Sequence, residues 1–256
     1  MNIIKEYFNY VLKAKGRHGT HSPFVYNLVD KCLHTKIDKK NEFFIKNFYK
    51  ELSKSDDLID FTDFGAGSKK MNKFRKVKNI LKNSSSKGKY AKLLFKVSKY
   101  YQPTNILELG TSLGVGTLNL HLGNPDSIIT SVEGCPNTFK YTYNQFQNLK
   151  PHQIKLINNK FSNFIENLEK DMKFDLIYID GHHDGKALAN YIEVLKPHYH
   201  NNTIIILDDI RWSNSMLNSW KKISSSENFH VSIDFFRMGL ITPRKEQGKE
   251  HFIIKF

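Results

Sequence analysis

Two apolar runs in the second half of the sequence end in carboxylates. FDLIYID ends at Asp180, and NTIIILDD ends at Asp208 and Asp209. If these runs are neighbouring parallel strands, their carboxyl ends meet at one edge of a sheet and the three side chains come together there. Like charges at such short distances need a compensating cation. A hard divalent ion, which prefers oxygen ligands, is one candidate.

A histidine-containing turn, GHHDG, follows Asp180 directly and places His183 three residues after that carboxylate. An imidazole can serve as a general base near neutral pH. The structural alternative is that Asp208 or Asp209 caps the helix that follows, and that the histidines lie solvated on a loop. The pattern alone leaves both interpretations open.

A glycine-rich segment, ILELGTSLGVGT, lies earlier in the chain and contains Gly110 and Gly114. Its spacing differs from the G-x-G-x-x-G fingerprint of pyrophosphate binding. Glycine still lets a ligand approach the backbone where a strand turns into a helix. Glu133 follows Gly110 by 23 residues, at the end of the next apolar run, where a carboxylate can accept both hydroxyls of a ribose. The segment predicts a ligand that contains adenosine but no pyrophosphate.

A second glycine loop, FTDFGAGSKK at 61–70, competes with the first one. No apolar run ending in an acid follows it at a comparable distance, and a basic stretch follows instead. We interpret it as a turn that could serve as a lid.

The pattern of apolar and polar residues from Asn105 onward predicts the secondary structure that positions these residues. Short apolar runs alternate with helical patterns, which indicates a parallel sheet wound with helices on both faces. The expected strands are 105–109, 127–132, 153–158, 174–180 and 202–209, and the expected helices are 114–122, 137–149, 160–172, 185–197 and 213–225. The tail has no room for another crossover helix, so 230–244 and 251–256 are expected to pair antiparallel.

The first part of the chain has a different character. Apolar residues at helical spacing predict short amphipathic helices around 3–12, 43–52 and 93–101. The NSSSKG segment has the composition of a flexible boundary. We therefore expect a helical, basic cap region at 1–104 and a ligand-binding domain at 105–256.

The glycine loop, the acid after it and the closing antiparallel strands resemble class I S-adenosylmethionine-dependent methyltransferases. ELGTSLGVGT is similar to the ELGxxxGxS/T version found in the catechol and caffeoyl-CoA O-methyltransferase group. The resemblance implies a doubly wound, Rossmann-like, seven-stranded α/β sheet with a C-terminal antiparallel hairpin. It also implies that Glu108, Gly110 and Gly114 line the methionine end of S-adenosylmethionine and that Glu133 holds its ribose.

That group holds magnesium with an acid after the fourth strand and an acid-Asn pair after the fifth. The matching residues are Asp180, Asp208 and Asp209, with Asp209 standing where the group has Asn. The extra negative charge puts Mg²⁺ as a second cofactor in doubt, and the sulfonium of S-adenosylmethionine is another cation that the carboxylates could face. The group's catalytic Lys falls on His183. The implied reaction is in-line displacement of the methyl group by an acceptor oxygen, which is deprotonated by His183 or by a metal at these carboxylates, with Asp180 catalytic in the same site.

Further segments resemble an uncharacterised Bacteroidetes-type branch of class I methyltransferases. They are RHGTHSPFVY near the start, DFGAGS, EGCP after the ribose acid, and the DDIRW ending of the fifth strand. DGHHDG is also similar to the DGDHSY turn of a broad bacterial branch, which again places that turn's His on His183. These resemblances imply an activity class and no particular acceptor.

The charge of the chain is concentrated in its first part. Residues 1–104 carry 23 basic and 9 acidic residues, whereas 105–256 carry 16 of each. The block Lys69–Lys99, with twelve basic residues, could attract RNA or an anionic surface. Only 5 of the 39 basic residues are Arg, the better ligand for phosphate, so a small-molecule acceptor is the favoured partner. An RNA acceptor, a non-catalytic module that binds anionic surfaces, and a homodimer remain alternatives.

Cysteine content and hydropathy bear on the compartment. The two cysteines, Cys32 and Cys135, are too far apart in sequence for a CxxC pair and suggest a reducing environment. No signal-peptide core and no run of about 18 apolar residues occur. We expect a cytoplasmic protein without stable membrane insertion.

Overall fold

The computed structural model describes residues 2–16, 21–62, 74–84, 88–149 and 153–256. The chain falls into two compact units, Leu33–Phe164 and Met1–Cys32 with Ile165–Phe256, which we call the middle unit and the terminal unit. The expected division into 1–104 and 105–256 stays a prediction. Most of the 61–70 loop and the centre of NSSSKG lie outside the described residues, so the expected lid and boundary stay predictions as well.

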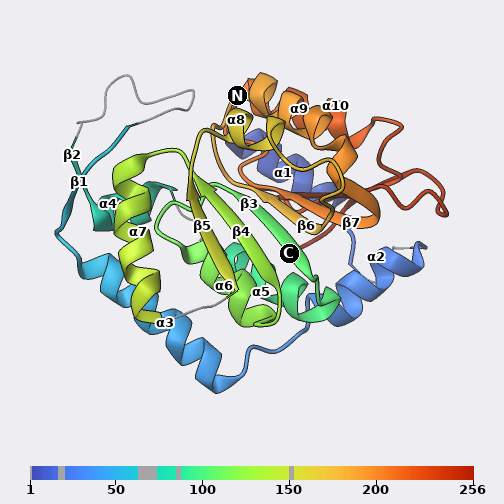
Figure 1. The fold of residues 1–256 in the computed structure, drawn as a ribbon. Coiled ribbons are helices and arrows are strands. Elements are labelled where there is room, and N and C mark those ends of the chain that lie inside the picture. The colour runs from blue at the N-terminus through green and yellow to red at the C-terminus, as the bar shows by residue number, and fades with distance from the viewer. Residues whose placement is uncertain (1, 17–20, 63–73, 85–87, 150–152) are drawn as a thin grey trace. The chain divides into compact units, whose positions relative to one another are not determined.

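The middle unit contains a parallel three-stranded arrangement, coloured green to yellow in Figure 1. Its strands are β3 (Asn105–Leu109), β4 (Ile128–Glu133) and β5 (Ile154–Asn158), with β4 between the other two. Helices α6 (Val115–Gly123) and α7 (Pro136–Leu149) make the connections, as parallel neighbours require. These strands and helices lie close to the ranges predicted from the sequence.

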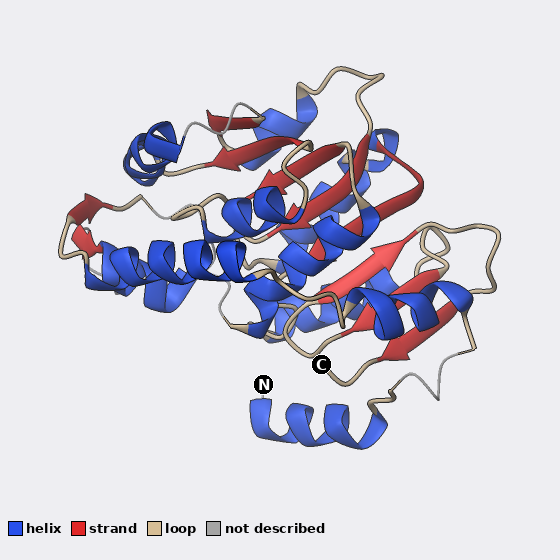
Figure 2. Cartoon of the chain, turned by 90° about the horizontal axis from the view of Figure 1, so that it is seen from below, coloured by secondary structure: helices blue, strands red, loops and turns tan. Residues whose placement is uncertain are grey.

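Helices and a small hairpin precede these strands in the middle unit. Helices α3 (Lys39–Lys54) and α5 (Lys89–Tyr101) confirm the expected helices around 43–52 and 93–101. Helix α4 (Val77–Ser84) and the antiparallel pair β1 (Leu58–Asp60) and β2 (Phe74–Lys76) were not expected. Figures 1 and 2 both show this short pair apart from the parallel strands. Three-residue strands are too short to display a period-two pattern, which explains why the sequence did not indicate them.

An apolar core fixes the glycine loop within the middle unit. Leu113, inside the loop, and Phe146 of α7 are buried together with residues of α3 and α4, including Leu52 and Ile80. Because Leu113 is buried among these side chains, the backbone of the segment between β3 and α6 is restricted to one conformation.

The terminal unit contains five strands among its described residues, in the order β10-β8-β9-β7-β6. They are β6 (Phe174–Ile179), β7 (Tyr199–Leu207), β8 (Val231–Asp234), β9 (Gly239–Thr242) and β10 (Glu250–Ile253). β6 and β7 are parallel, β9 is antiparallel to both β7 and β8, and β10 is parallel to β8. The parallel pair confirms that the two carboxylate-ending runs are neighbours.

The tail corrects one expectation. The segment 230–244 is not a single strand: it folds back on itself at Phe235–Met238, so that β8 and β9 form the antiparallel hairpin. The last strand, expected to pair antiparallel with it, instead runs parallel to β8. Residues Phe235–Met238 include no Gly, Pro or Asn that would have predicted a turn. Phe236 takes the left-handed conformation instead, with φ of 74°. The α/β class and the hairpin are confirmed, whereas the count of seven strands is not.

Helices complete the terminal unit. They are α1 (Ile3–Lys13), α2 (Pro23–Asn27) with a π-helical turn at Leu28–Cys32, α8 (Phe161–Glu166) at the unit boundary, α9 (Gly185–Val194), a 3-10 turn at Lys196–His198, and α10 (Asn214–Ser224). Helices α9 and α10 pack together closely: a Cβ on Gly185 would lie 2.3 Å from the Ser215 carbonyl oxygen. α1 confirms the helix predicted around 3–12.

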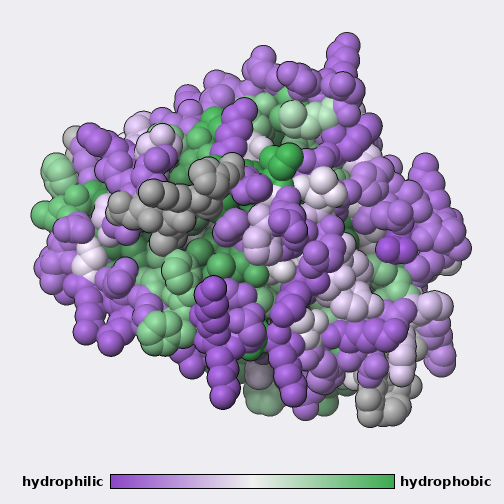
Figure 3. Space-filling view, turned by 60° about the horizontal axis from the view of Figure 1, so that its bottom comes forward, coloured by the Kyte–Doolittle hydropathy of each residue, from purple (hydrophilic) through white to green (hydrophobic). Residues whose placement is uncertain are grey.

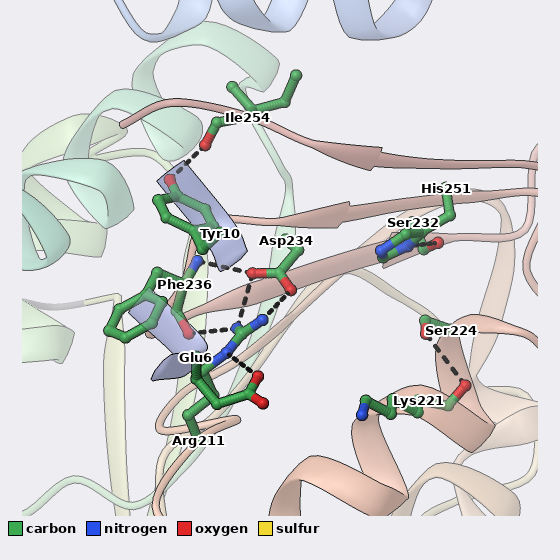
Figure 4. Close-up of polar contacts among 10 residues, drawn as sticks. All are labelled: Glu6, Tyr10, Arg211, Lys221, Ser224, Ser232, Asp234, Phe236, His251 and Ile254. Carbon is green, nitrogen blue, oxygen red and sulfur yellow. Dashed lines mark hydrogen bonds and ion pairs between the residues drawn. The ribbon is translucent and has the colours of Figure 1, made fainter. Parts of the chain in front are cut away.

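Helix α1 is attached to the C-terminal strands of its own unit. The Tyr10 hydroxyl donates to the Ile254 carbonyl oxygen at 2.5 Å, and the Glu6 carboxylate lies 3.7 Å from Nε of Arg211 (Figure 4). The Tyr7 ring meets the Phe236 ring edge-on, with centroids 5.1 Å apart. The first helix therefore packs beside the reversal between β8 and β9.

The face drawn in Figure 3 is mostly hydrophilic, with hydrophobic side chains gathered in places. α1 contributes exposed apolar residues, among them Ile4, Phe8 and Leu12. Among the described residues, no helix combines the length and the hydropathy needed to cross a membrane.

Candidate functional site

The loop between β3 and α6 has the backbone of a ligand-binding turn. Gly110, Ser112 and Gly114 have φ of 113°, 47° and 79°, so the chain reverses through three left-handed residues before the helix begins. Packing also requires a glycine at position 114, because a Cβ on Gly114 would lie 2.3 Å from Cε2 of Phe146. Gly114 is therefore required for the shape of the loop, whether or not a ligand is bound.

Glu133, at the end of β4, ties this loop down. Its carboxylate accepts the backbone N–H groups of Ser112 and Cys135, each at 2.8 Å. Burial raises the pKa of this carboxyl, and these backbone hydrogen bonds oppose the rise. A carboxylate has about four acceptor positions, so lone pairs remain for two hydroxyl donors. The sequence placed Glu133 correctly at the strand end but did not indicate its contact with the loop.

Glu108 on β3 lies fully buried behind the same loop. Its Oε2 accepts the hydroxyls of Thr117 and Ser131, both at 2.5 Å, whereas its buried Oε1 has no hydrogen-bond partner among the described residues. Burial raises the pKa of Glu108 to about 7; the two hydroxyls lower it and the Glu133 charge raises it further. A buried acceptor without a donor is costly, so this oxygen suits a ligand that supplies an N–H group or a positive charge.

Three carboxylates meet in the terminal unit, as the strand order predicts. Asp180 follows β6, and Asp208 and Asp209 follow β7. The hydroxyl of Tyr178 lies 3.0 Å from Oδ2 of Asp180 and 3.1 Å from Oδ2 of Asp208, so it can donate to either carboxylate. Asp208 is only 2% exposed.

Arg237 supplies a cation that the sequence analysis did not identify. It lies on the reversal between β8 and β9, and its Nε is 3.1 Å from Oδ1 of Asp208 and 2.9 Å from Oδ1 of Asp209. In the sequence, the isolated Arg in the apolar segment FFRMG is the feature that could have indicated a buried cation. The need for a compensating cation was recognised from the sequence, but its source 28 residues after Asp209 was not.

The protonation of this cluster reflects burial and crowding. Burial raises the pKa of Asp180 well above its usual range, with the charges of Asp208 and Asp209 adding to the effect and Arg237 opposing it. The pKa of Asp209 is also raised, by burial first and by the Asp208 charge second, with Arg237 and His183 opposing. Burial disfavours the charged guanidinium of Arg237, but the surrounding carboxylates raise its pKa above the ordinary value.

His183 stands at the edge of the cluster, on the turn before α9. Its φ is 39°, and its Nδ1 lies 3.9 Å from Oδ2 of Asp209, beyond hydrogen-bond distance. Its ring centroid is 5.2 Å from that of Trp212, a side chain that is 57% exposed. The next residue, Asp184, accepts the N–H of Ala187 and caps α9. The helix that follows Asp208 and Asp209 is α10, and Ser213 caps it: its hydroxyl oxygen accepts the N–H of Met216 at 3.1 Å, so neither aspartate is the cap.

One group of side chains has the spacing of metal ligands. A carboxylate oxygen of Asp180, a ring nitrogen of His183 and a carboxylate oxygen of Asp209 lie within 4.8 Å of one another. Asp208, the third residue expected from the sequence, is not in this group.

Comparison with known proteins bears on this arrangement. Residues 107–210, from β3 to just past β7, match a family model described as a methyltransferase domain. No protein of curated function matches the chain.

Solved structures share the fold at low sequence identity. An S-adenosylhomocysteine-bound methyltransferase of Podospora anserina is 14% identical, with a TM-score of 0.56, covering 81% of this chain and 97% of its own. An O-methyltransferase of Bacillus cereus in complex with S-adenosylhomocysteine is 15% identical, with a TM-score of 0.55 and coverages of 84% and 94%. A Staphylococcus aureus protein assigned as a caffeoyl-CoA O-methyltransferase is 13% identical, with a TM-score of 0.54 and coverages of 80% and 100%. The Bacteroidetes-type branch stays a prediction. Residues 107–210 are thus similar to methyltransferase domains, and the chain shares its fold with methyltransferases solved with S-adenosylhomocysteine.

Proposed function

We propose that this protein is a class I S-adenosylmethionine-dependent methyltransferase that transfers the methyl group of S-adenosylmethionine to an oxygen of a small-molecule acceptor. The observation that carries the proposal is the pair of carboxylates beside the glycine loop, one with a buried oxygen that lacks a donor and one with lone pairs to spare. Neighbours with this fold include O-methyltransferases, which supports oxygen as the acceptor atom.

The cofactor fits the residues of the middle unit. Oε1 of Glu108 would receive the ammonium group of the methionine moiety, which supplies both the missing donor and the missing charge. Gly110 and Gly114 would let the methionine moiety approach the loop backbone, and Glu133 would accept the ribose hydroxyls. S-adenosylmethionine, once bound, supplies an electrophilic methyl group on a sulfonium.

The terminal unit contains the candidate general base, His183. S-adenosylmethionine would supply an electrophilic methyl group to the acceptor oxygen, and the His183 ring would take up the acceptor proton. Asp209, whose Oδ2 lies 3.9 Å from Nδ1 of His183, stabilises the imidazolium that forms. Asp180 lies in the same cluster, and its raised pKa makes it the second group able to hold a proton there.

Magnesium, which the resemblance implies, does not suit the residues present. The group within 4.8 Å includes an imidazole, whereas Mg²⁺ prefers an all-oxygen octahedron. Asp208 already contacts Arg237 and Tyr178. The residues present therefore do not fit magnesium at Asp180, Asp208 and Asp209.

RNA as the acceptor has less support. Several lysines of the described part of the basic block contact neighbours: Lys76 and Lys78 lie 2.7 and 2.8 Å from Asp56, and Lys92 lies 3.6 Å from Glu42. Such pairs reduce the positive charge available to phosphates.

The test combines binding with label transfer. Methyl-labelled S-adenosylmethionine is incubated with the protein and either a metabolite extract or total RNA, and we expect label only in a methoxy group of a small molecule, identified by mass spectrometry. His183→Ala should lower kcat by roughly 10²- to 10⁴-fold without changing the affinity for S-adenosylhomocysteine, as expected for loss of a general base. His182→Ala, in the same turn, is the matched control and should retain most of the rate. Label in RNA alone, or equal loss in both variants, would contradict the proposal.

A further inference from the structure

We propose that Arg237 is the resident cation of the Asp180, Asp208 and Asp209 cluster and that it keeps divalent metal ions out of it. The part that Arg237 plays in catalysis rests on the proposed function. The exclusion of divalent metal ions does not, and it can be tested without methyl transfer.

Both carboxylate oxygens of Asp208 contact protein donors. Its Oδ1 receives the N–H of Asp209 at 2.7 Å and Nε of Arg237 at 3.1 Å, and its Oδ2 lies 3.1 Å from the Tyr178 hydroxyl and 3.3 Å from Nη2 of Arg237. A carboxylate offers about four lone-pair positions, so the Asp209 N–H, the Arg237 guanidinium and the Tyr178 hydroxyl already engage both oxygens, with the single Tyr178 proton shared between Asp208 and Asp180. A metal ion could bind Asp208 only by displacing protein donors.

Asp209 is also partly committed to the same guanidinium. Its Oδ1 lies 2.9 Å from Nε of Arg237, whereas its Oδ2 is the oxygen nearest to His183. A divalent ion bound to Asp209 would stand within a few Å of the Arg237 charge, and that repulsion is strong in a half-buried site. The cluster thus already contains the cation that its charge requires.

Arg237 cannot easily swing away, because the reversal that carries it is held on several sides. The Phe236 N–H donates to Oδ1 of Asp234 at 2.7 Å, and Nη1 of Arg211 donates to the Phe236 carbonyl oxygen at 2.7 Å (Figure 4). The carbonyl of Arg237 itself accepts the N–H of Ile210 at 2.9 Å. Arg211 and Asp234 pair through two hydrogen bonds of 2.8 and 2.6 Å. The guanidinium is therefore preorganised rather than a flexible surface charge.

The role that follows is one of positioning. Arg237 acts on the reaction through Asp208 and Asp209: it neutralises them and fixes Asp209 with Oδ2 towards His183. With Arg237 as the resident cation, the His183 ring is not a metal ligand and can take up the acceptor proton.

The experiment titrates Mn²⁺ alone into the full chain and follows free Mn²⁺ by electron paramagnetic resonance. We expect no saturable site in the unaltered protein. Arg237→Gln should gain a saturable Mn²⁺ site, because a nearby positive charge has been removed and oxygens of Asp208 and Asp209 have been released. Arg237→Lys retains the charge and should stay without the site.

Each outcome decides the inference. A stoichiometric Mn²⁺ site in the unaltered protein, or a folded Arg237→Gln variant that gains no affinity, would overturn it; circular dichroism establishes that the variants are folded. If Arg237→Gln does not fold, the titration of the unaltered protein and of Arg237→Lys still decides. Calorimetry with S-adenosylhomocysteine runs in parallel: loss of that binding would count against the proposed function and leave the metal result standing.

Discussion

Two groups of carboxylates among the described residues differ in how their negative charge is stabilised. In the middle unit, Glu108 and Glu133 are stabilised by hydroxyl and backbone donors, and one oxygen of Glu108 has no partner among the described residues. In the terminal unit, Asp208 and Asp209 share a guanidinium. A carboxylate group that lacks a cation indicates a place for a charged ligand, whereas one that contains its own cation does not.

The largest expected change in stability follows from removing the guanidinium of Arg237. Arg237→Gln should lower the free energy of unfolding by about 3 to 5 kcal/mol, since removing one partner of a buried pair leaves uncompensated carboxylates. Urea denaturation at neutral pH measures it. Lys196→Gln is the control: that exposed ammonium pairs with the exposed Glu193 and should contribute about 1 kcal/mol or less. Similar losses in the two variants would show that Arg237 is an ordinary surface arginine.

The next effect concerns the group without a cation. The pKa of Glu108 is raised from 4.5 to about 7 in the folded protein. Between these two pH values the carboxyl of Glu108 is protonated in the native state and ionised in the unfolded state. Its stabilising contribution is complete below pH 4.5 and is lost as the pH rises through 7, by about 3 kcal/mol in total.

Glu108→Gln should remove this slope. The stability of the variant relative to the unaltered protein should rise between pH 4 and pH 8, measured by urea denaturation at each pH without ligand. Saturating S-adenosylhomocysteine should reduce the difference, because its ammonium would stabilise the ionised Glu108. Parallel pH profiles for the two proteins would mean that Glu108 ionises normally.

A smaller effect tests the ribose contact. Glu133→Gln should weaken S-adenosylhomocysteine binding by about 1.5 to 3 kcal/mol, through loss of charge-assisted hydrogen bonds from the ribose hydroxyls. Calorimetry measures the change. Glu193→Gln, which alters an exposed carboxylate paired with Lys196, is the control and should leave the affinity unchanged. Unchanged binding in Glu133→Gln would remove that residue from the cofactor site.

The smallest expected effect is on the basic block. Lys89→Glu combined with Lys92→Glu should leave S-adenosylhomocysteine affinity unchanged, because these exposed side chains belong to neither carboxylate group. The same variant should abolish any RNA binding in a gel-shift assay. Tight RNA binding by the unaltered protein that this variant loses, together with methyl transfer into RNA, would promote the RNA-modifying alternative.

Most of the scaffold could be predicted because it follows from local patterns. The alternation of apolar runs and helical segments from Asn105 to Leu207 indicated the strands, and the acids at their ends were found by position alone. The reversal at Phe235–Met238 escaped prediction because a phenylalanine, not a glycine, occupies its left-handed position. The partners of Asp208 could not be predicted either, since Arg237 comes from a distant turn whose placement depends on strand pairing.

The attachment of α1 has a consequence for how the chain acquires its structure during synthesis. Tyr10 and Ile254 are 244 residues apart in sequence, and their hydrogen bond cannot form until nearly the whole chain has left the ribosome. The middle unit is continuous in sequence and can gather its contacts earlier, whereas the terminal unit must wait for its last strand. Contacts of such high sequence separation slow folding. The reversal that carries Arg237 is therefore completed late, and a chain that stops before β10 lacks the strand edge on which its first helix docks.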